Sequence, residues 1–258
     1  MTQQFYVSPE QLMKDRADFA RKGIGRGRSV VVMSCRDGIA LVAENPSPSL
    51  HKLGEIYDRI AFAAVGKYNE FESLRQAGVR YADVRGYSYA REDVTARGLA
   101  SVYAQSLGAV FTAESKPFEV ELVVAEVGHS QERDHLYRLT FDGSIADETG
   151  FVVMGGAADA VIGALKGVWS AGLSLPEGVR AAATALRNDG VAAPAPPTGQ
   201  PTGGENGEAP GKPALDPSLL EVAYLERDPD TLRGSRRAFR RIGGAELEAT
   251  LQQQPQGA

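Results

Sequence analysis

Cysteine and histidine are scarce in this sequence, which has one cysteine, Cys35, and three histidines among its 258 residues. A single cysteine excludes a disulfide bond within the chain, and its place in an apolar strand pattern favours a small core residue over a nucleophile. The histidines, His51, His129 and His135, lack the helical spacing typical of metal ligands. We therefore expect neither a metal nor another cofactor.

Long apolar runs and an excess of positive charge are also missing. No run approaches the roughly 18 apolar residues that a membrane-spanning helix needs, and the start, MTQQFYVSPE, has neither the basic residues nor the apolar centre of a secretion signal. The formal net charge is −5, which argues against a nucleic-acid surface, and the basic stretches at 21–28 and 233–241 are too local to reverse this. We expect a cytoplasmic protein with no membrane and no nucleic acid among its partners.

A helix signal stands near the N-terminus. Ser8 has the side chain of an N-cap, Pro9 suits the first helical position, and Gln11 is placed to return a capping-box hydrogen bond. The helix is expected to end in the glycines of residues 23–27 (GIGRG). Because these glycines follow a helix and precede a strand, the reverse of a dinucleotide-binding loop, we interpret them as a C-cap and turn.

Apolar and β-branched runs predict strands on both sides of two helical pairs. Strands are expected at 29–34, 39–44, 60–66, 118–127, 136–141, 150–154, 219–225 and 238–242, and helices at 69–84, 92–111, 157–171 and 176–187. Asp37-Gly38 and Asp142-Gly143 are typical of tight turns. Gly155-Gly156 favours close packing over phosphate binding, because no Lys-Ser or Lys-Thr accompanies it. This order predicts one α+β domain with helices on both outer faces.

The composition divides the chain further. Residues 189–216 are rich in proline and glycine and nearly free of large apolar side chains, which predicts a disordered insertion. Residues 8–188 and 217–252 are expected to form a single domain around it, because the apolar runs after the insertion still need a sheet to join. Residues 1–7 are expected to be a flexible segment, and residues 253–258 a frayed tail.

Several stretches carry a resemblance to a known family. The text SVVVMSCRDGIALVAENPSPS followed by HKLGEIYDRIAFAAVG resembles the opening of proteasome-type subunits, and SPEQLMKDRADFARKGIGRG resembles the helix that distinguishes α-type subunits. Further stretches, YNEFESLRQAG, RGYSYAREDVTARGLASVYAQSLG, KPFEVELVVAEVG and YRLTFDGSIADE, are similar to actinobacterial proteasome α subunits. The resemblance spans nearly the whole chain except 189–216 and the tail. It implies a four-layer αββα sandwich of two antiparallel sheets, the N-terminal nucleophile hydrolase fold.

The resemblance also implies that this chain is not itself catalytic. In the catalytic β subunits of the family, an N-terminal threonine is the nucleophile, and its free amine, a lysine and a carboxylate assist it. The matching strand here begins in mid-chain at Arg28-Ser29, so no free amine exists there. Glu44 at the carboxylate position is interpreted as strand-end polarity or as a structural hydrogen-bonding residue. Thr2, which removal of Met1 would expose, is separated from that strand by the predicted helix. We expect a structural and gating subunit of a threonine-type endopeptidase complex.

Two candidate sites follow from the family. Ring ATPases insert C-terminal tails into pockets between α subunits, and Lys52 and Gly66 match the pocket lysine, which pairs with the tail carboxylate, and a pocket glycine. The alternative is a solvated lysine paired with Glu55 or Asp58. The segment before the helix is expected to gate the pore, and its residues are Met1, Thr2, Gln3, Gln4, Phe5, Tyr6, Val7, Ser8 and Pro9.

The implied partners are those of a proteasome core. They are six further copies of the chain in a heptameric α ring, β subunits, a hexameric AAA ATPase that delivers proteins tagged with a ubiquitin-like modifier, and the protein substrates in transit. Two other hypotheses stay open: a hydrolase that acts through Thr2, and a ring scaffold without a proteolytic role.

Overall fold

The computed structural model describes residues 8–187, 216–228 and 237–252, and in these the chain forms two five-stranded antiparallel sheets packed face to face. The first sheet has the order β10-β9-β2-β1-β8, and the second has the order β3-β4-β5-β6-β7. The first sheet contains β1 (Val30–Cys35), β2 (Gly38–Glu44), β8 (Phe151–Met154), β9 (Leu220–Glu226) and β10 (Phe239–Ile242). The second contains β3 (Leu53–Tyr57), β4 (Ile60–Gly66), β5 (Val120–Glu126), β6 (His135–Leu139) and β7 (Ile145–Glu148).

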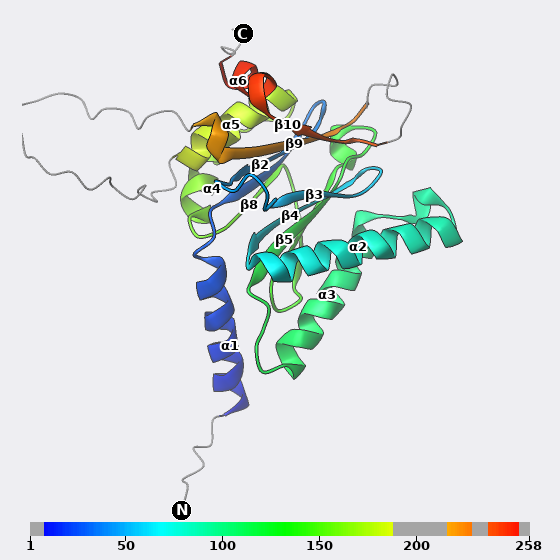
Figure 1. Cartoon of the computed structure of the whole chain (residues 1–258), viewed down its shortest axis with the longest axis vertical. Coiled ribbons are helices and arrows are strands. Elements are labelled where there is room, and N and C mark those ends of the chain that lie inside the picture. Colours follow the sequence, from blue (N-terminus) through cyan, green and yellow to red (C-terminus); the bar gives the residue numbers. More distant parts are fainter. Residues whose placement is uncertain (1–7, 188–215, 229–236, 253–258) are drawn as a thin grey trace, which may run out of the picture.

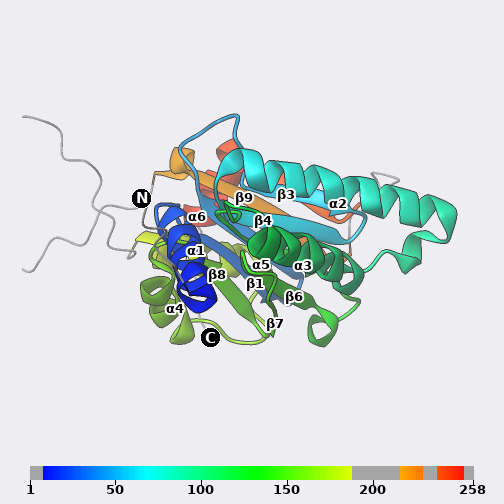
Figure 2. The same cartoon turned by 90° about the horizontal axis from the view of Figure 1, so that it is seen from below.

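Helices cover both outer faces of the paired sheets, with α4 and α5 on the first sheet and α2 and α3 on the second (Figures 1 and 2). The helices are α1 (Pro9–Ile24), α2 (Tyr68–Ser88), α3 (Ala96–Ala113), α4 (Ala158–Lys166), α5 (Leu175–Arg187) and α6 (Gly244–Gln252). Short 3-10 turns are η1 (Arg91–Asp93), η2 (Gln131–Arg133) and η3 (Pro217–Leu219). The predicted four-layer αββα sandwich, with an N-terminal helix, is confirmed.

The layering explains why the strands read as nearly unbroken apolar runs. Along β1, Val30 and Val32 face the space between the sheets, whereas Val31 and Met33 face α4 and α5. Successive side chains of a strand point to opposite faces, and here both faces are covered. The same applies to β4, where Ala63 faces the first sheet and Phe62 faces α2 and α3. Burial on both sides therefore replaces the apolar-polar alternation of a half-exposed strand.

Helix α1 begins as the sequence predicts but without a complete capping box. Ser8 Oγ accepts a hydrogen bond from the Gln11 amide at 3.2 Å, and Pro9 occupies the first turn. The Gln11 side chain donates to Asp15 at 2.6 Å and does not return to Ser8, so the capping-box prediction was half wrong. At the other end, Ala20 and Ile24 are buried and pack into the core between the sheets. The helix therefore closes one end of the sandwich.

The sequence prediction missed three elements, β3, β7 and α6. β3 (LGEIY) is short and contains a glycine, and β7 (IADE) has mostly exposed side chains, so neither gave an apolar pattern. Helix α6 begins directly after β10, with only Gly243 between them, and the sequence analysis assigned no element to these last residues of the domain. Helix α4 ends at Lys166, several residues before its predicted end at 171, because a turn follows at Gly167.

The Gly155-Gly156 step serves close packing. A Cβ atom on Gly155 would lie 2.9 Å from Ser29 Cα, and one on Gly156 would lie 2.1 Å from the Gly25 carbonyl oxygen.

Among the described residues, no helix is both long and apolar enough to cross a membrane. The predicted gate residues 1–7, the insertion up to residue 215 and the tail 253–258 lie outside the described residues.

Candidate functional site

Lys52 lies where the ends of several strands meet. It directly precedes β3, and its carbonyl accepts a hydrogen bond from the Ala64 amide on β4 at 3.1 Å. Gly66 ends β4 two residues further on, so Lys52 and Gly66 stand at the same end of the second sheet. The start of β1 and the end of β2 reach this point from the first sheet. The fold thus brings together the two residues that the sequence assigned to one pocket.

The Lys52 ammonium is held by main-chain oxygens. Its Nζ donates to the Arg28 carbonyl at 2.8 Å and to the Glu44 carbonyl at 3.0 Å. Within residues 8–187, 216–228 and 237–252 no carboxylate lies at ion-pair distance from this nitrogen. Burial lowers the pKa of Lys52 to about 8, although the nearby charges of Glu44 and Glu221 oppose that shift. The site therefore holds a largely buried cation that its own chain does not neutralise by direct contact.

The alternative pairing of Lys52 with Glu55 or Asp58 is wrong. Glu55 is paired with Arg237, whose Nε donates to it at 2.8 Å. Asp58 is held by Arg91, whose Nε donates to it at 2.8 Å. The Lys52 ammonium donates to the Arg28 and Glu44 carbonyls instead.

Ser29 and Glu44, which stand at the nucleophile and carboxylate positions of the catalytic subunits, lie close to Lys52 but are not arranged for catalysis. The Ser29 side chain is buried, and its Oγ has no hydrogen-bond partner among the described residues. The Glu44 carboxylate forms an ion pair with the Arg28 guanidinium, while the Lys52 ammonium contacts only the Glu44 main chain. Because the Ser29 nitrogen is part of a peptide bond, it cannot act as the amine base of an N-terminal nucleophile.

Glu221 on β9 fixes the backbone around Lys52. Its carboxylate accepts hydrogen bonds from the amides of Lys52 at 2.8 Å and Leu53 at 3.2 Å. It also accepts from Asn45 Nδ2 at 2.8 Å and from the Arg241 guanidinium at 2.7 Å. Glu221 is 9% exposed, and these donors satisfy its charge. Sequence reasoning missed this residue, although an acidic side chain within the apolar run LLEVAYL was a usable signal.

Gly66 is required by the path of the backbone. Its φ of +116° lies in the region that glycine tolerates and other residues rarely adopt. A Cβ atom there would stand 1.9 Å from the Glu119 carbonyl oxygen. A Cβ on Gly27 would likewise stand 2.4 Å from Val65 Cγ1, so the chain before Arg28 packs directly on the end of β4. Because both positions are glycine, neighbouring parts of the chain can pack directly against the backbone at this end of β4.

Only two of the nine predicted gate residues lie within the part of the chain that the structure describes. Ser8 and Pro9 form the start of α1, whereas Met1 to Val7, with Thr2 among them, lie outside the described residues. Their role remains a prediction.

Comparison with known proteins gives the family. The model of the proteasome subunit family matches residues 24–189. The chain is 70% identical over 251 residues to the proteasome subunit alpha of Pseudarthrobacter chlorophenolicus, which covers 97% of this chain and 100% of that protein. It is 69% identical over 251 residues to that of Arthrobacter sp., covering 97% and 98%, and 66% identical over 258 residues to that of Renibacterium salmoninarum, covering 100% and 99%. The chain therefore belongs to the proteasome subunit family, as an α-type member of its actinobacterial branch.

Proposed function

We propose that this chain is a non-catalytic subunit of the heptameric α ring of a cytoplasmic proteasome core, where it forms the gated entry pore and docks a hexameric AAA ATPase. That ATPase delivers tagged proteins to β subunits, which carry out the cleavage. The observation that carries the proposal is the Lys52 ammonium, which is bound by two main-chain carbonyls and by no carboxylate of the described residues.

The chemistry of this ammonium suits a terminal carboxylate. A lysine ammonium has three N–H donors, and carbonyl oxygens take two of them here. One donor and the full positive charge remain for a ligand. An inserted carboxylate would neutralise a cation that burial destabilises, and it would form a charge-assisted hydrogen bond.

The non-catalytic role is supported by what surrounds Ser29. Its hydroxyl lacks the free amine that an N-terminal nucleophile uses as its base, and the Glu44 carboxylate is already neutralised by Arg28. Peptide hydrolysis by the chain alone that disappears in Thr2→Ala would favour a Thr2 hydrolase instead. Failure of a β subunit to co-purify after co-expression would favour the non-proteolytic scaffold.

Replacement of Lys52 tests the docking role directly. In Lys52→Ala the tail carboxylate is left unpaired at a partly desolvated site, which costs about 2–5 kcal/mol for each pocket. Because several tails engage one ring, avidity falls together with affinity. ATPase binding and ATPase-stimulated protein degradation should therefore be lost, while ring assembly and basal hydrolysis of short peptides stay near wild type. Lys52→Arg should rescue docking only in part, since a planar fork does not replace a compact ammonium.

The matched control is Lys166→Ala. This change removes an exposed lysine from the last turn of α4, in the helical layer on the first sheet, whereas Lys52 precedes β3 of the second sheet. This variant should dock the ATPase as the wild type does. Undiminished ATPase binding by the Lys52→Ala core would show that this ammonium does not receive the tail.

A further inference from the structure

Glu221, near the start of β9, is surrounded by hydrogen-bond donors. They come from the β2–β3 loop, from β3 and from β10, and they are Asn45, Lys52, Leu53 and Arg241. Two of the donating groups are main-chain amides, one is a side-chain amide and one is a guanidinium. An ionised carboxylate only accepts hydrogen bonds, so it suits these surroundings better than the amide of a glutamine would.

The donors include both ends of the loop that carries Lys52. This loop, residues 45–52, runs from the end of β2 to the start of β3. Asn45 Nδ2 and the Lys52 amide donate to the same carboxylate oxygen of Glu221, each at 2.8 Å. Asn45 Nδ2 also donates to the Leu50 carbonyl inside the loop, at 2.7 Å. One oxygen of Glu221 therefore joins the first residue of the loop to the last.

The other carboxylate oxygen links the two sheets. It accepts from the Leu53 amide of β3, in the second sheet, and from Arg241 of β10, in the first sheet. Arg241 Nη2 donates in turn to the Leu53 carbonyl at 2.7 Å, so Leu53 is held through both of its main-chain polar groups. The start of β3, and Lys52 just before it, thus has a fixed place relative to the first sheet. That sheet includes β2, whose last carbonyl is one of the two acceptors of the Lys52 ammonium.

The Glu221 charge also acts on the Lys52 ammonium at a distance. Burial lowers the pKa of Lys52 to about 8, the charges of Glu44 and Glu221 oppose that shift, and the charge of Arg28 adds to it. The basic groups next to Glu221 itself are Arg241 and His51. A neutral residue in place of Glu221 would remove one of the negative charges that favour the protonated ammonium, so the pKa of Lys52 should fall further.

We propose that Glu221 positions Lys52 for the docking of a partner carboxylate: it holds both ends of the β2–β3 loop against the two sheets and places a negative charge near the ammonium. This inference rests on the docking role proposed for Lys52. Glu221 is 9% exposed and its oxygens accept from its own chain, so it acts through Lys52 and does not touch the partner. A residue that holds a binding group in place contributes to affinity because small displacements weaken the contacts of that group.

The first readout measures Lys52 without any ATPase. The full chain, in whatever assembly it forms, is labelled with trace acetic anhydride between about pH 6 and 10. Peptide mass spectrometry then gives the acetylation of Lys52 relative to that of the exposed Lys166. In the wild type the midpoint should lie near pH 8. In Glu221→Gln it should move to lower pH by about half a unit or more, whereas Glu221→Asp keeps the charge and should keep the midpoint.

The second readout is binding of the ATPase that tests Lys52→Ala. At about pH 6.5, where the Lys52 ammonium is largely charged in each protein, Glu221→Gln should bind about fivefold more weakly or worse, because the glutamine amide meets donors. Glu221→Asp should lose a similar factor at every pH, since its shorter side chain cannot reach all the donors. At about pH 8, Glu221→Gln alone should lose affinity beyond that factor and beyond the decline of the wild type, because its Lys52 is the more neutral.

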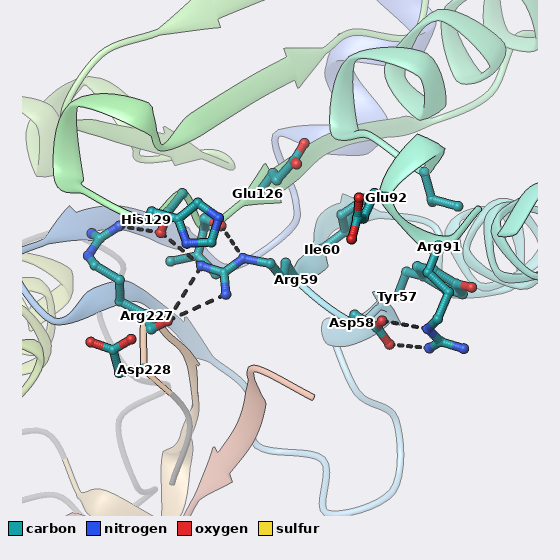
Figure 3. Close-up of a pocket in the computed structure, with 13 residues that line it drawn as sticks. Tyr57, Asp58, Arg59, Ile60, Arg91, Glu92, Glu126, His129, Arg227 and Asp228 are labelled. Atoms are coloured by element: carbon teal, nitrogen blue, oxygen red, sulfur yellow. Dashed lines mark hydrogen bonds and ion pairs between the residues drawn. The ribbon is translucent and has the colours of Figure 1, made fainter. Parts of the chain in front are cut away.

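Two control variants remove carboxylates elsewhere. Glu226→Gln acts at the other end of β9, where Glu226 pairs with Arg240 of β10 at 2.7 Å. Asp58→Asn acts at the far turn of the β3–β4 hairpin, where Asp58 faces Arg91 (Figure 3). Both should keep the wild-type midpoint and the wild-type affinity.

The outcomes separate this inference from the docking proposal. A wild-type midpoint in Glu221→Gln, or an equal shift in a control, would overturn the inference and leave the docking proposal intact. Undiminished docking by Lys52→Ala would overturn both. If Glu221→Gln folds poorly, Glu221→Asp still decides, because docking equal to that of the wild type would show that the reach of this side chain does not matter.

Discussion

The ion pair between Asp134 and Arg227 gives the sharpest prediction for stability. The side chain of Asp134 is 2% exposed and that of Arg227 is 9% exposed. The guanidinium donates to both carboxylate oxygens, at 2.7 and 3.0 Å. Asp134 also accepts from the Ser34 hydroxyl at 2.7 Å and from the Gly128 amide at 2.9 Å. The remaining donors of Arg227 go to the carbonyls of Arg36, Cys35 and Gly128. This one pair connects β9, the β1–β2 turn and the β5–β6 loop.

Asp134→Asn preserves the shape of the side chain and removes the charge that balances Arg227. Breaking a buried pair by neutralising one partner costs about 3–5 kcal/mol. With a urea m-value of about 3 kcal/mol/M, the unfolding midpoint should fall by about 1–1.7 M. The fluorescence of Trp169, the single tryptophan of the chain, can follow the transition.

The matched control is Asp18→Asn. Asp18 and its partner Arg21 are 59% and 65% exposed, so this change should cost less than about 1 kcal/mol. A loss below about 1 kcal/mol in Asp134→Asn, or an equal loss in both variants, would refute the reasoning that burial gives the Asp134 pair its weight.

Three further outcomes are expected. Gly66→Ala should lower the free energy of unfolding by at least about 2 kcal/mol because of its φ of +116° and the 1.9 Å clash, measured by urea unfolding. Gly167→Ala, with φ of −87° and no atom within 4 Å, should be neutral or stabilising by up to about 1 kcal/mol; equal losses would contradict the clash. Because the pKa of Lys52 is lowered to about 8, the empty pocket loses its charge as pH rises through 8, so ATPase affinity should fall between pH 7.5 and 9 in wild type but not in Lys52→Arg. Parallel pH profiles would argue against Lys52 as the titrating group. Deletion of residues 2–7 should speed short-peptide cleavage by the assembled core, and equal rates would mean that these residues are no gate.

The residue patterns predicted a layered α+β domain with helices on both outer faces because its strands are buried on both sides, whereas the sandwich of two antiparallel sheets was implied by the family resemblance. Runs such as those at β1, β4 and β5 can lie only inside a layered domain, and the helix signal at Ser8-Pro9 is local chemistry that needs no tertiary information. β7 was missed for the converse reason. Its side chains are exposed, and it exists because β6 offers an edge for it to pair with.

The candidate site was only half predictable. Lys52 and Gly66 were found from a resemblance, but their surroundings depend on contacts between distant parts of the chain. Glu221 follows Lys52 by 169 residues, and nothing near Lys52 indicates that this carboxylate binds its amide.

The way in which Lys52 is held has a consequence for how this site tolerates sequence change. Both acceptors of its ammonium are carbonyl oxygens, of Arg28 and Glu44, and every residue type supplies a carbonyl at those positions. Substitutions at 28 and 44 can therefore accumulate without removing the acceptors, provided that the backbone keeps its path. The positions that cannot drift are the ones that set this path, such as Gly66. Related chains can then share the same cation in the same place while differing in the side chains that surround it.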